Sequence, residues 1–151
     1  MTEIKDFSSP LQGRLMKIDE VPDEVFSTRA MGDGFAIDIT GNKVTAPMDG
    51  TISSVYPTGH AVLMTLDNGI EVMIHVGLDS YKIAGVNTIM CKADDHVSKG
   101  DVLVNTDVKK LKKNGCSTIS PIVFLSQEKI SLTKTDAMVD NQDEGFVTIE
   151  R

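Results

Sequence analysis

Two histidines, His60 and His75, are the residues of this chain best placed to do chemistry. They lie in one stretch, from Thr58 to Asp79, that reads as strands around a tight turn. A neutral imidazole is a competent nucleophile near pH 7, where its charge also changes readily. An arbitrary pair of strand histidines is more often satisfied by local hydrogen bonds than functional. Thr58 favours a site here, because it lies one same-face step before His60 and its hydroxyl can fix the tautomer of that ring.

The elements that must position the imidazoles are two strands joined by a tight turn. Asp67-Asn68-Gly69 between alternating apolar residues is typical of a β-hairpin. A two-residue loop places His75 opposite His60 or opposite Val62, so that both rings share one face. Their Cβ atoms are then about 5 Å apart in a direct pair, or roughly 7–8 Å apart in a diagonal one. A three-residue loop without a bulge would put the rings on opposite faces. We predict the shared face.

The second strand of this hairpin has one unbroken apolar face. It consists of Ile70, Val72, Ile74, Val76 and Leu78. His75 therefore projects from the other face, beside Gly77, whose small size leaves room for a ligand.

The composition is that of a globular, acidic protein. Of 151 residues, 40% are hydrophobic, and 22 acidic against 15 basic residues give a net charge of −7. This charge argues against nucleic acid and anionic membranes as main partners. No apolar run approaches the roughly 18 residues of a membrane span and no signal peptide is apparent, so we expect a cytoplasmic protein without membrane insertion. Cys91 and Cys116 form no C-x-x-C motif and are expected to be reduced thiols.

The rest of the chain predicts many short strands and little helix. We expect a mobile lead over residues 1–9 and a single domain over residues 10–151. The best helix candidate runs from Asp107, as N-cap, to Gly115. The predicted fold class is all-β, a compact antiparallel β-sandwich or barrel with one or two short helices.

A loop bounded by Gly, Pro and Asp carries the apolar residues Val25, Phe26 and Met31. Such residues more often pack in the hydrophobic core. Clustered in a loop of this kind, they can instead form an exposed docking patch. The pattern alone favours the core, and the patch is the minority alternative.

Taken together, these residues resemble a known family. Thr58-x-His60, followed by the run from Gly69 to Asp79, looks like the signature of the glucose-family enzyme IIA of the bacterial phosphoenolpyruvate-dependent sugar phosphotransferase system. The resemblance covers nearly the whole chain from Pro10 onward. Its other parts are residues 21–26, 31–34, 46–51, 97–101 and 117–121.

The resemblance implies a phosphocarrier without a cofactor. In the family, Nε2 of one histidine, here His75, accepts the phosphoryl group of the histidine-containing phosphocarrier protein. It then passes the group to a cysteine of a sugar-specific enzyme IIB domain, which supports sugar uptake with phosphorylation. The partner histidine falls on His60, which can donate a hydrogen bond to a phosphoryl oxygen while Thr58 holds it.

Two partners must then dock in turn on one face, which requires exposed apolar residues with few charges. The resemblance makes the docking patch the favoured interpretation of the apolar loop. Two acidic residues match the rim of the family's site, where they can meet an arginine or lysine of a partner. The implied partner-binding residues are Asp23, Val25, Phe26, Met31, Tyr56, Asp79 and Tyr81.

The chain departs from the family pattern at two positions. Ser80 stands where threonine is common, and the hydroxyl survives. Gly59 is smaller and freer than the family's usual residue before the partner histidine, which predicts a looser His60.

Zinc bridges the two histidines in some complexes of the family, but two nitrogen ligands alone do not make a site, so no metal is expected in the free protein.

Three other classes of protein are alternatives to the phosphocarrier. Zinc-dependent murein endopeptidases need H-x-x-x-D and H-x-H ligand sets, and Met64 and Gly77 stand at the required positions. A biotinyl or lipoyl carrier needs a lysine at a hairpin tip, whereas Lys17 precedes the matching turns. The alternative that stays open is a mainly regulatory protein, which binds other enzymes or transporters according to its phosphorylation state.

Overall fold

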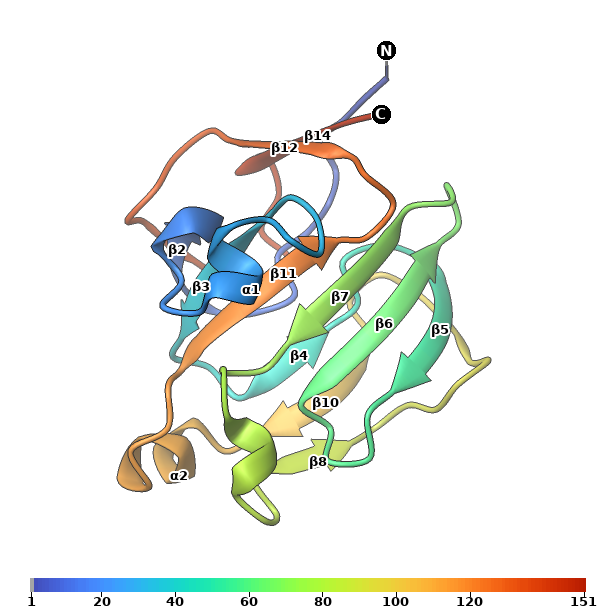
Figure 1. Ribbon diagram of the computed structural model, residues 1–151. Helices are drawn as coiled ribbons and strands as arrows, with labels where there is room; N and C mark the ends of the chain where they lie inside the picture. The colour runs from blue at the N-terminus through green and yellow to red at the C-terminus, as the bar shows by residue number, and fades with distance from the viewer. Residues whose placement is uncertain (1) are drawn as a thin grey trace.

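Antiparallel strands are the main secondary structure of the protein, as the computed structural model of residues 2–151 shows (Figure 1). The largest sheet has eight strands, in the order β13-β2-β3-β11-β7-β6-β5-β9, and two three-stranded sheets have the orders β4-β10-β8 and β1-β14-β12. The bounds of the strands are β1 Glu3–Ile4, β2 Gly13–Lys17, β3 Gly34–Ile39, β4 Lys43–Thr45, β5 Gly50–Val55, β6 Ala61–Leu66, β7 Glu71–His75, β8 Asn87–Ile89, β9 His96–Val97, β10 Val102–Thr106, β11 Ile119–Phe124, β12 Lys129–Leu132, β13 Met138–Val139 and β14 Val147–Glu150.

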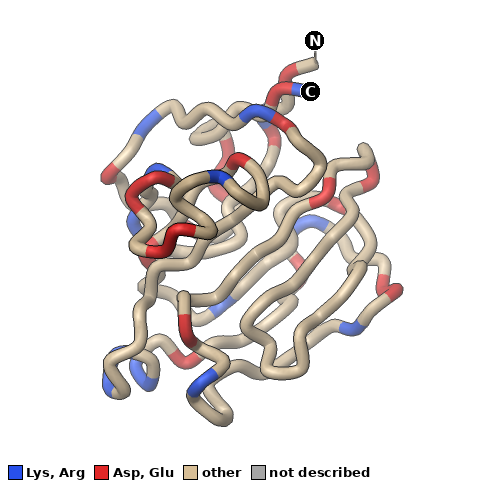
Figure 2. The backbone as a smooth tube through the Cα atoms, in the orientation of Figure 1, with Lys and Arg blue, Asp and Glu red and all other residues tan. Residues whose placement is uncertain are grey.

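Helices are few and short. Two α-helices, α1 (Glu24–Ser27) and α2 (Val108–Lys113), accompany two 3₁₀ turns, η1 (Ile18–Glu20) and η2 (Ser80–Lys82). The Asp107 side chain accepts a hydrogen bond from Lys110 N at 3.0 Å, and Gly115 has a φ of +70°, so the predicted cap and stop of α2 are confirmed. Blue segments in Figure 2 mark the lysines of α2. The prediction of an all-β fold with one or two short helices is confirmed.

The main core lies between the eight-stranded sheet and the β4-β10-β8 sheet. Val62 and Ile74 of the large sheet belong to the same fully buried cluster as Val44 and Val104 of the small one. In Figure 1, β4 and β10 accordingly run behind β6 and β7. Alternation along β7 sends its apolar row into this core, as predicted, and sends His75 to the outer face.

The outer face of the large sheet carries a second apolar cluster. It is covered by the segment that contains η1 and α1, visible in front of β11 and β3 in Figure 1. Its buried members are Met16, Ile18, Val21, Phe26, Ala36, Ala61, Met73 and Val123. The end of β7 that bears His75 therefore lies at the border of an apolar layer and solvent.

The turn between β6 and β7 has three residues, so the predicted two-residue loop is wrong. Leu66 N donates to Ile70 O at 2.8 Å, which leaves Asp67, Asn68 and Gly69 as the loop. His75 therefore pairs with Ala61, not with His60 or Val62.

The N-terminal segment is part of the fold and differs from the mobile lead that we expected; Met1 lies outside the described residues. Glu3 and Ile4 pair with β14, and Phe7, Ser8 and Ser9 are buried. The Phe7 ring lies 5.3 Å from Phe124, centroid to centroid. The polar character of the first residues suggested mobility, but one buried aromatic side chain is enough to anchor such a segment.

Replacing Phe7 with Ala is expected to lower the free energy of unfolding by about 3–5 kcal/mol, because a fully buried aromatic side chain is lost from the main core. Urea denaturation measures this change. Lys5→Ala, at an exposed position of the same segment, is the control and is expected to change stability by less than about 0.5 kcal/mol. Equal effects of the two substitutions would contradict the packing of this segment.

Candidate functional site: a pair of imidazoles

His75 is the last residue of β7, and its ring is oriented by the backbone that follows. Nδ1 lies 2.6 Å from the carbonyl oxygen of Gly77. A carbonyl oxygen only accepts, so Nδ1 carries the proton and donates it, and the lone pair of Nε2 faces away from this bond. Gly77 has a φ of +63°, a conformation that glycine adopts without strain. The nucleophilic tautomer is thus set by the turn after the strand.

The Gly77 peptide is itself held from behind by the start of β11 and the segment that leads into it. Its N–H donates to Ser120 Oγ at 2.9 Å, and a Cβ on Gly77 would lie 2.7 Å from the carbonyl oxygen of Ser117. Only glycine therefore fits between His75 and this segment. Ser120 had not been singled out from the sequence, although the matched run of residues 117–121 contains it.

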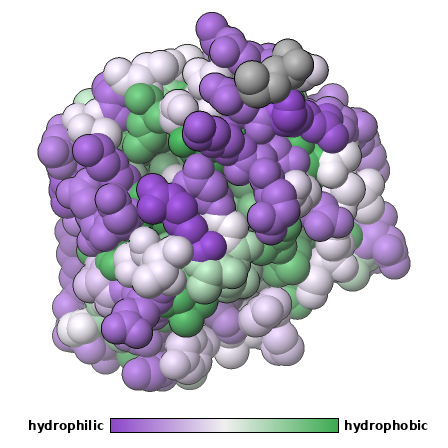
Figure 3. Space-filling model, turned by 45° about the horizontal axis from the view of Figure 1, so that its top comes forward, coloured by the Kyte–Doolittle hydropathy of each residue, from purple (hydrophilic) through white to green (hydrophobic). Residues whose placement is uncertain are grey.

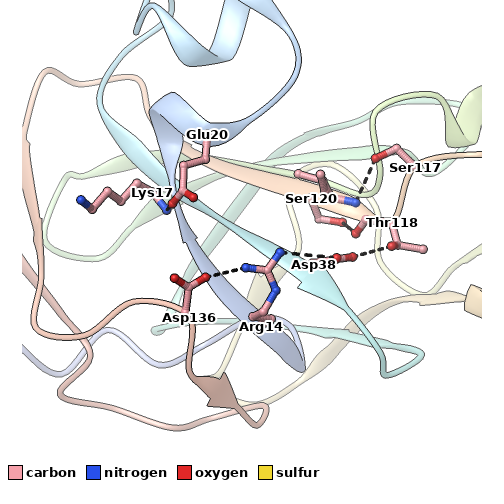
Figure 4. Close-up of polar contacts among 9 residues, drawn as sticks. Arg14, Lys17, Glu20, Asp38, Ser117, Thr118, Ser120 and Asp136 are labelled. Carbon is pink, nitrogen blue, oxygen red and sulfur yellow. Dashed lines mark hydrogen bonds and ion pairs between the residues drawn. The ribbon is translucent and has the colours of Figure 1, made fainter.

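A polar network fixes that segment to β2 and β3 (Figure 4). The Thr118 hydroxyl donates to the Asp38 carboxylate at 2.5 Å. Arg14 lies between two carboxylates, with Nη1 2.6 Å from Asp136 and Nη2 3.9 Å from Asp38. Residues far apart in the chain thereby support the turn that orients His75.

His60 lies in the turn between β5 and β6, not on a strand. Gly59 N donates to Tyr56 O at 2.7 Å, and β6 begins only at Ala61. Because Ala61 pairs with His75, a continued strand would have turned the His60 ring to the opposite face. The bend at Gly59, with a φ of +71°, brings the ring back to the His75 side. The predicted meeting of the two rings is confirmed, but by a different geometry.

The two imidazoles are neighbours. Their ring centroids are 5.3 Å apart, with the planes inclined by 72°. The Thr58 hydroxyl is hydrogen bonded to Nδ1 of His60, as predicted, which leaves Nε2 of that ring unengaged by Thr58. In both rings, Nε2 is therefore the nitrogen that these local hydrogen bonds leave free.

Aromatic rings surround the pair. Phe26 packs on His75, with centroids 5.3 Å apart, and Tyr56 and Tyr81 pack on His60 at 4.9 and 5.3 Å. These contacts restrict rotation of both imidazoles. They also remove part of each ring from water.

Burial is the main reason why the pKa of each histidine lies below the ordinary value of 6.5. For His60, the nearby charge of a protonated His75 lowers the pKa further. For His75, the Gly77 carbonyl and the carboxylates of Asp23 and Asp79 oppose the effect of burial without reversing it. Both rings are consequently neutral at pH 7, which is the form that a nucleophilic imidazole requires.

The two predicted acidic residues lie beside His75 in different roles. The Asp23 side chain caps α1 by accepting from Val25 N at 2.9 Å. Asp79 is half exposed and lies 3.7 Å from the ammonium group of Lys82. Both carboxylates act on His75 electrostatically, so the structure brings them to the site.

Most of the predicted docking residues are exposed, and the two tyrosines among them contact the imidazole pair. Val25, Met31, Tyr56 and Tyr81 are exposed, the first of them to 50%. Patches of apolar surface bordered by hydrophilic groups are visible in Figure 3. Phe26 is different, because only 7% of it is exposed and it packs into the second apolar cluster and on His75. Its predicted place in an exposed patch is wrong, because Phe26 faces inward from α1 into these contacts.

Groups outside the imidazole pair offer less chemistry. Cys91 and Cys116 are free, and burial, assisted by Asp95, raises the pKa of the Cys91 thiol. Within residues 2–151, no three or more His, Cys, Asp or Glu side chains are grouped as a metal site would require. The described helices include none that is long and apolar enough to cross a membrane.

Fold and site together define an antiparallel β-sandwich with two neutral, mutually packed imidazoles at the edge of an apolar surface. The family model of the phosphoenolpyruvate-dependent sugar phosphotransferase system, EIIA 1, matches residues 5–130. The chain belongs to this family, and the resemblance noted from the sequence is confirmed.

Individual relatives agree with this assignment. The chain is 34% identical over 138 residues to a glucose-specific EIIA component of Staphylococcus epidermidis, an alignment that covers 89% of this chain and 83% of that protein. It is 36% identical over 122 residues to a Staphylococcus aureus protein of the same name, covering 80% and 74%. A solved structure of glucose permease IIA from Mycoplasma capricolum superimposes with a TM-score of 0.87 at 32% identity, over 97% of this chain and 96% of that one.

The free energy of unfolding is expected to be independent of the histidines above about pH 7.5 and to fall as the pH decreases below it. There the unfolded chain, with ordinary histidine pKa values, binds protons before the folded chain does. Urea denaturation between about pH 7.5 and about pH 5.5 measures the slope of the free energy of unfolding against pH. This range lies above the one in which most carboxylates titrate. The matched control is the double variant His60→Gln/His75→Gln, which is expected to flatten it. An equal slope in wild type and control would contradict the lowered pKa values.

Proposed function

We propose that this chain is a cytoplasmic phosphocarrier in which Nε2 of His75 accepts a phosphoryl group from the histidine-containing phosphocarrier protein. The group then passes to a cysteine of a sugar-specific enzyme IIB domain. The observation that carries this proposal is the hydrogen bond from His75 Nδ1 to the Gly77 carbonyl, because it leaves the Nε2 lone pair as the nucleophile. The staphylococcal relatives are named glucose-specific, so glucose is the sugar that we propose.

Each transfer is a displacement at phosphorus. In the first, the Nε2 lone pair of His75 forms a new P–N bond while the P–N bond of the donor phosphohistidine breaks and its imidazole keeps the electron pair. In the second, a cysteine thiolate forms a P–S bond and His75 recovers its lone pair. The proton on Nδ1 of His75 stays in its bond to Gly77 throughout, so His75 needs no separate base.

His60 is proposed to stabilise the phosphoryl group during these steps. If the Thr58 hydroxyl donates to Nδ1 of His60, the ring proton resides on Nε2 and points to a group bound at the neighbouring His75. A hydrogen bond from that N–H to a phosphoryl oxygen favours the charge distribution of the transition state. Because the pKa of His60 is lowered, the ring serves as a neutral donor at pH 7.

The exposed apolar residues around the imidazoles are proposed to receive both partners. Tyr56 and Tyr81 pack on His60, and the exposed Val25 is the neighbour of Phe26, which packs on His75, so a partner that covers these residues also covers the reacting atoms. Exclusion of water there strengthens every electrostatic interaction of the transfer. Asp23 and Asp79 at the edge can meet cationic side chains of a partner.

Replacing His75 with Ala is expected to abolish phosphorylation, because the nucleophile is lost. Incubation with phosphoenolpyruvate, enzyme I and the phosphocarrier protein, followed by intact mass and site mapping, measures this. Wild type is expected to gain one acid-labile phosphoryl group on His75. His96→Ala removes the exposed histidine outside the pair and serves as the control, with wild-type labelling. Labelling of the His75 variant at the wild-type rate would place the nucleophile elsewhere.

Replacing His60 with Gln is expected to leave acceptance by His75 largely intact and to slow transfer to enzyme IIB by about 10- to 100-fold, because an amide fills the position without the geometry of the imidazole N–H. Single-turnover rates of the two transfers, measured separately with labelled phosphoryl groups, test this. Unchanged onward transfer would remove His60 from the mechanism.

A further inference from the structure

Asn87, the first residue of β8, connects the surroundings of the two imidazoles. Its side-chain Nδ2 lies 3.3 Å from the carbonyl oxygen of Thr58, in the turn that bears His60. The same nitrogen lies 3.1 Å from Oγ of Ser80, in the turn that follows His75. One amide group therefore bridges the turn that bears His60 and the segment that follows His75.

The second contact continues to the backbone beside His75. The Ser80 hydroxyl donates its only proton to the carbonyl oxygen of Val76 at 2.5 Å, so toward Asn87 it must accept. Val76 N in turn donates to the His60 carbonyl at 2.7 Å. The chain of bonds from Asn87 thus reaches the residue next to His75, and it has a fixed direction.

The orientation of the Asn87 amide follows from its partners. Exchanging its oxygen and nitrogen would set Oδ1 against the Thr58 carbonyl oxygen, and two acceptors repel. Oδ1 as placed is buried and has no protein partner within residues 2–151. A buried acceptor without a protein partner does not stabilise the folded state. The asparagine at this position is therefore explained by its donor group, Nδ2.

Packing adds to the hydrogen bonds. A Cβ on Gly59 would lie 3.0 Å from Cβ of Asn87 and 3.1 Å from Cγ1 of Ile89. The turn is therefore pressed against β8, and Gly59 does not leave His60 loose, contrary to the expectation from its small size.

We propose that Asn87 is a positioning residue, which fixes the turn bearing His60 relative to the segment after His75 and so sets the geometry of the imidazole pair. Its consequence for phosphoryl transfer rests on the proposed function. The side chain does not touch the reacting atoms. It acts through the Thr58 carbonyl and through Ser80.

The test compares Asn87→Ala and Asn87→Leu with Thr88→Ala. Leucine has the branched heavy-atom shape of asparagine and fills at least its volume, but it donates nothing, and Thr88 is an exposed neighbour on the same strand. Histidine titration and ring-to-ring contacts are followed by NMR in the unphosphorylated protein, where Tyr56, Tyr81 and His75 are the titratable groups against the His60 ring. Both Asn87 variants are expected to weaken the His60–His75 contacts and to move the pKa of His60 upward toward its ordinary value, as water returns and the distance to His75 grows. Thr88→Ala is expected to match wild type.

Transfer kinetics provide the second readout. Both Asn87 variants are expected to slow transfer to enzyme IIB by about 3- to 10-fold, the range for loss of one positioning hydrogen bond, while acceptance by His75 stays within about 2-fold of wild type. A merely structural role would slow both transfers equally.

Three results would overturn the proposal. The first is an unchanged His60 titration and unchanged ring contacts in both Asn87 variants. The second is wild-type behaviour of Asn87→Leu alone, which would assign the effect to volume and not to the amide. The third is altered ring geometry with an unchanged rate of onward transfer. If wild type itself accepts no phosphoryl group, the proposed function fails, and the NMR comparison still decides whether Asn87 positions His60.

Discussion

The hydrogen bond from Nδ1 of His75 to the Gly77 carbonyl is the interaction on which the rest of the site depends. It places the ring proton, directs Nε2 outward and requires a backbone turn that only glycine adopts next to Ser117. A neutral ring with one bonded and one free nitrogen is less costly to hold at an apolar border than an imidazolium. The low pKa comes from burial at the edge of the second apolar cluster, whereas the tautomer comes from the bond to Gly77, which by itself raises the pKa.

The second imidazole is constrained in a different way. Strand pairing alone would have turned His60 away from His75, and the bend at Gly59 reverses this. A turn is easier to displace than a strand, because fewer backbone hydrogen bonds hold it. The contacts from Tyr56, Tyr81 and Thr58 are therefore more important for His60 than the aromatic contact from Phe26 is for His75, which its own backbone already orients.

Alternation of apolar residues was sufficient to predict the buried row of β7 and the outward direction of His75, because burial on one face imposes a period of two. The α2 cap was predictable from Asp107 and Gly115 for equally local reasons. The length of the 67–69 turn was not, since Asp-Asn-Gly suits loops of two or three residues. For Phe26 the residue pattern alone favoured the core, and only the resemblance moved it to an exposed patch. Its inward rotation follows from tertiary packing against His75 and the second apolar cluster. The positions of Ser120 and Asn87 also depend on such packing, because each contacts residues distant in the chain.

The charges of the site are consistent with the proposal that one face serves two partners in turn. Before transfer, the imidazole pair is neutral, and the nearby carboxylates of Asp23 and Asp79 give the surface a negative edge. If His75 carries a phosphoryl group, as proposed, the centre of the same surface becomes strongly negative as well. No new contact is needed for the two states to differ, because the apolar residues around the pair stay in place. The donor then leaves a surface that has become more anionic, and an acceptor with cationic groups near its thiolate is favoured there only while the phosphoryl group is present.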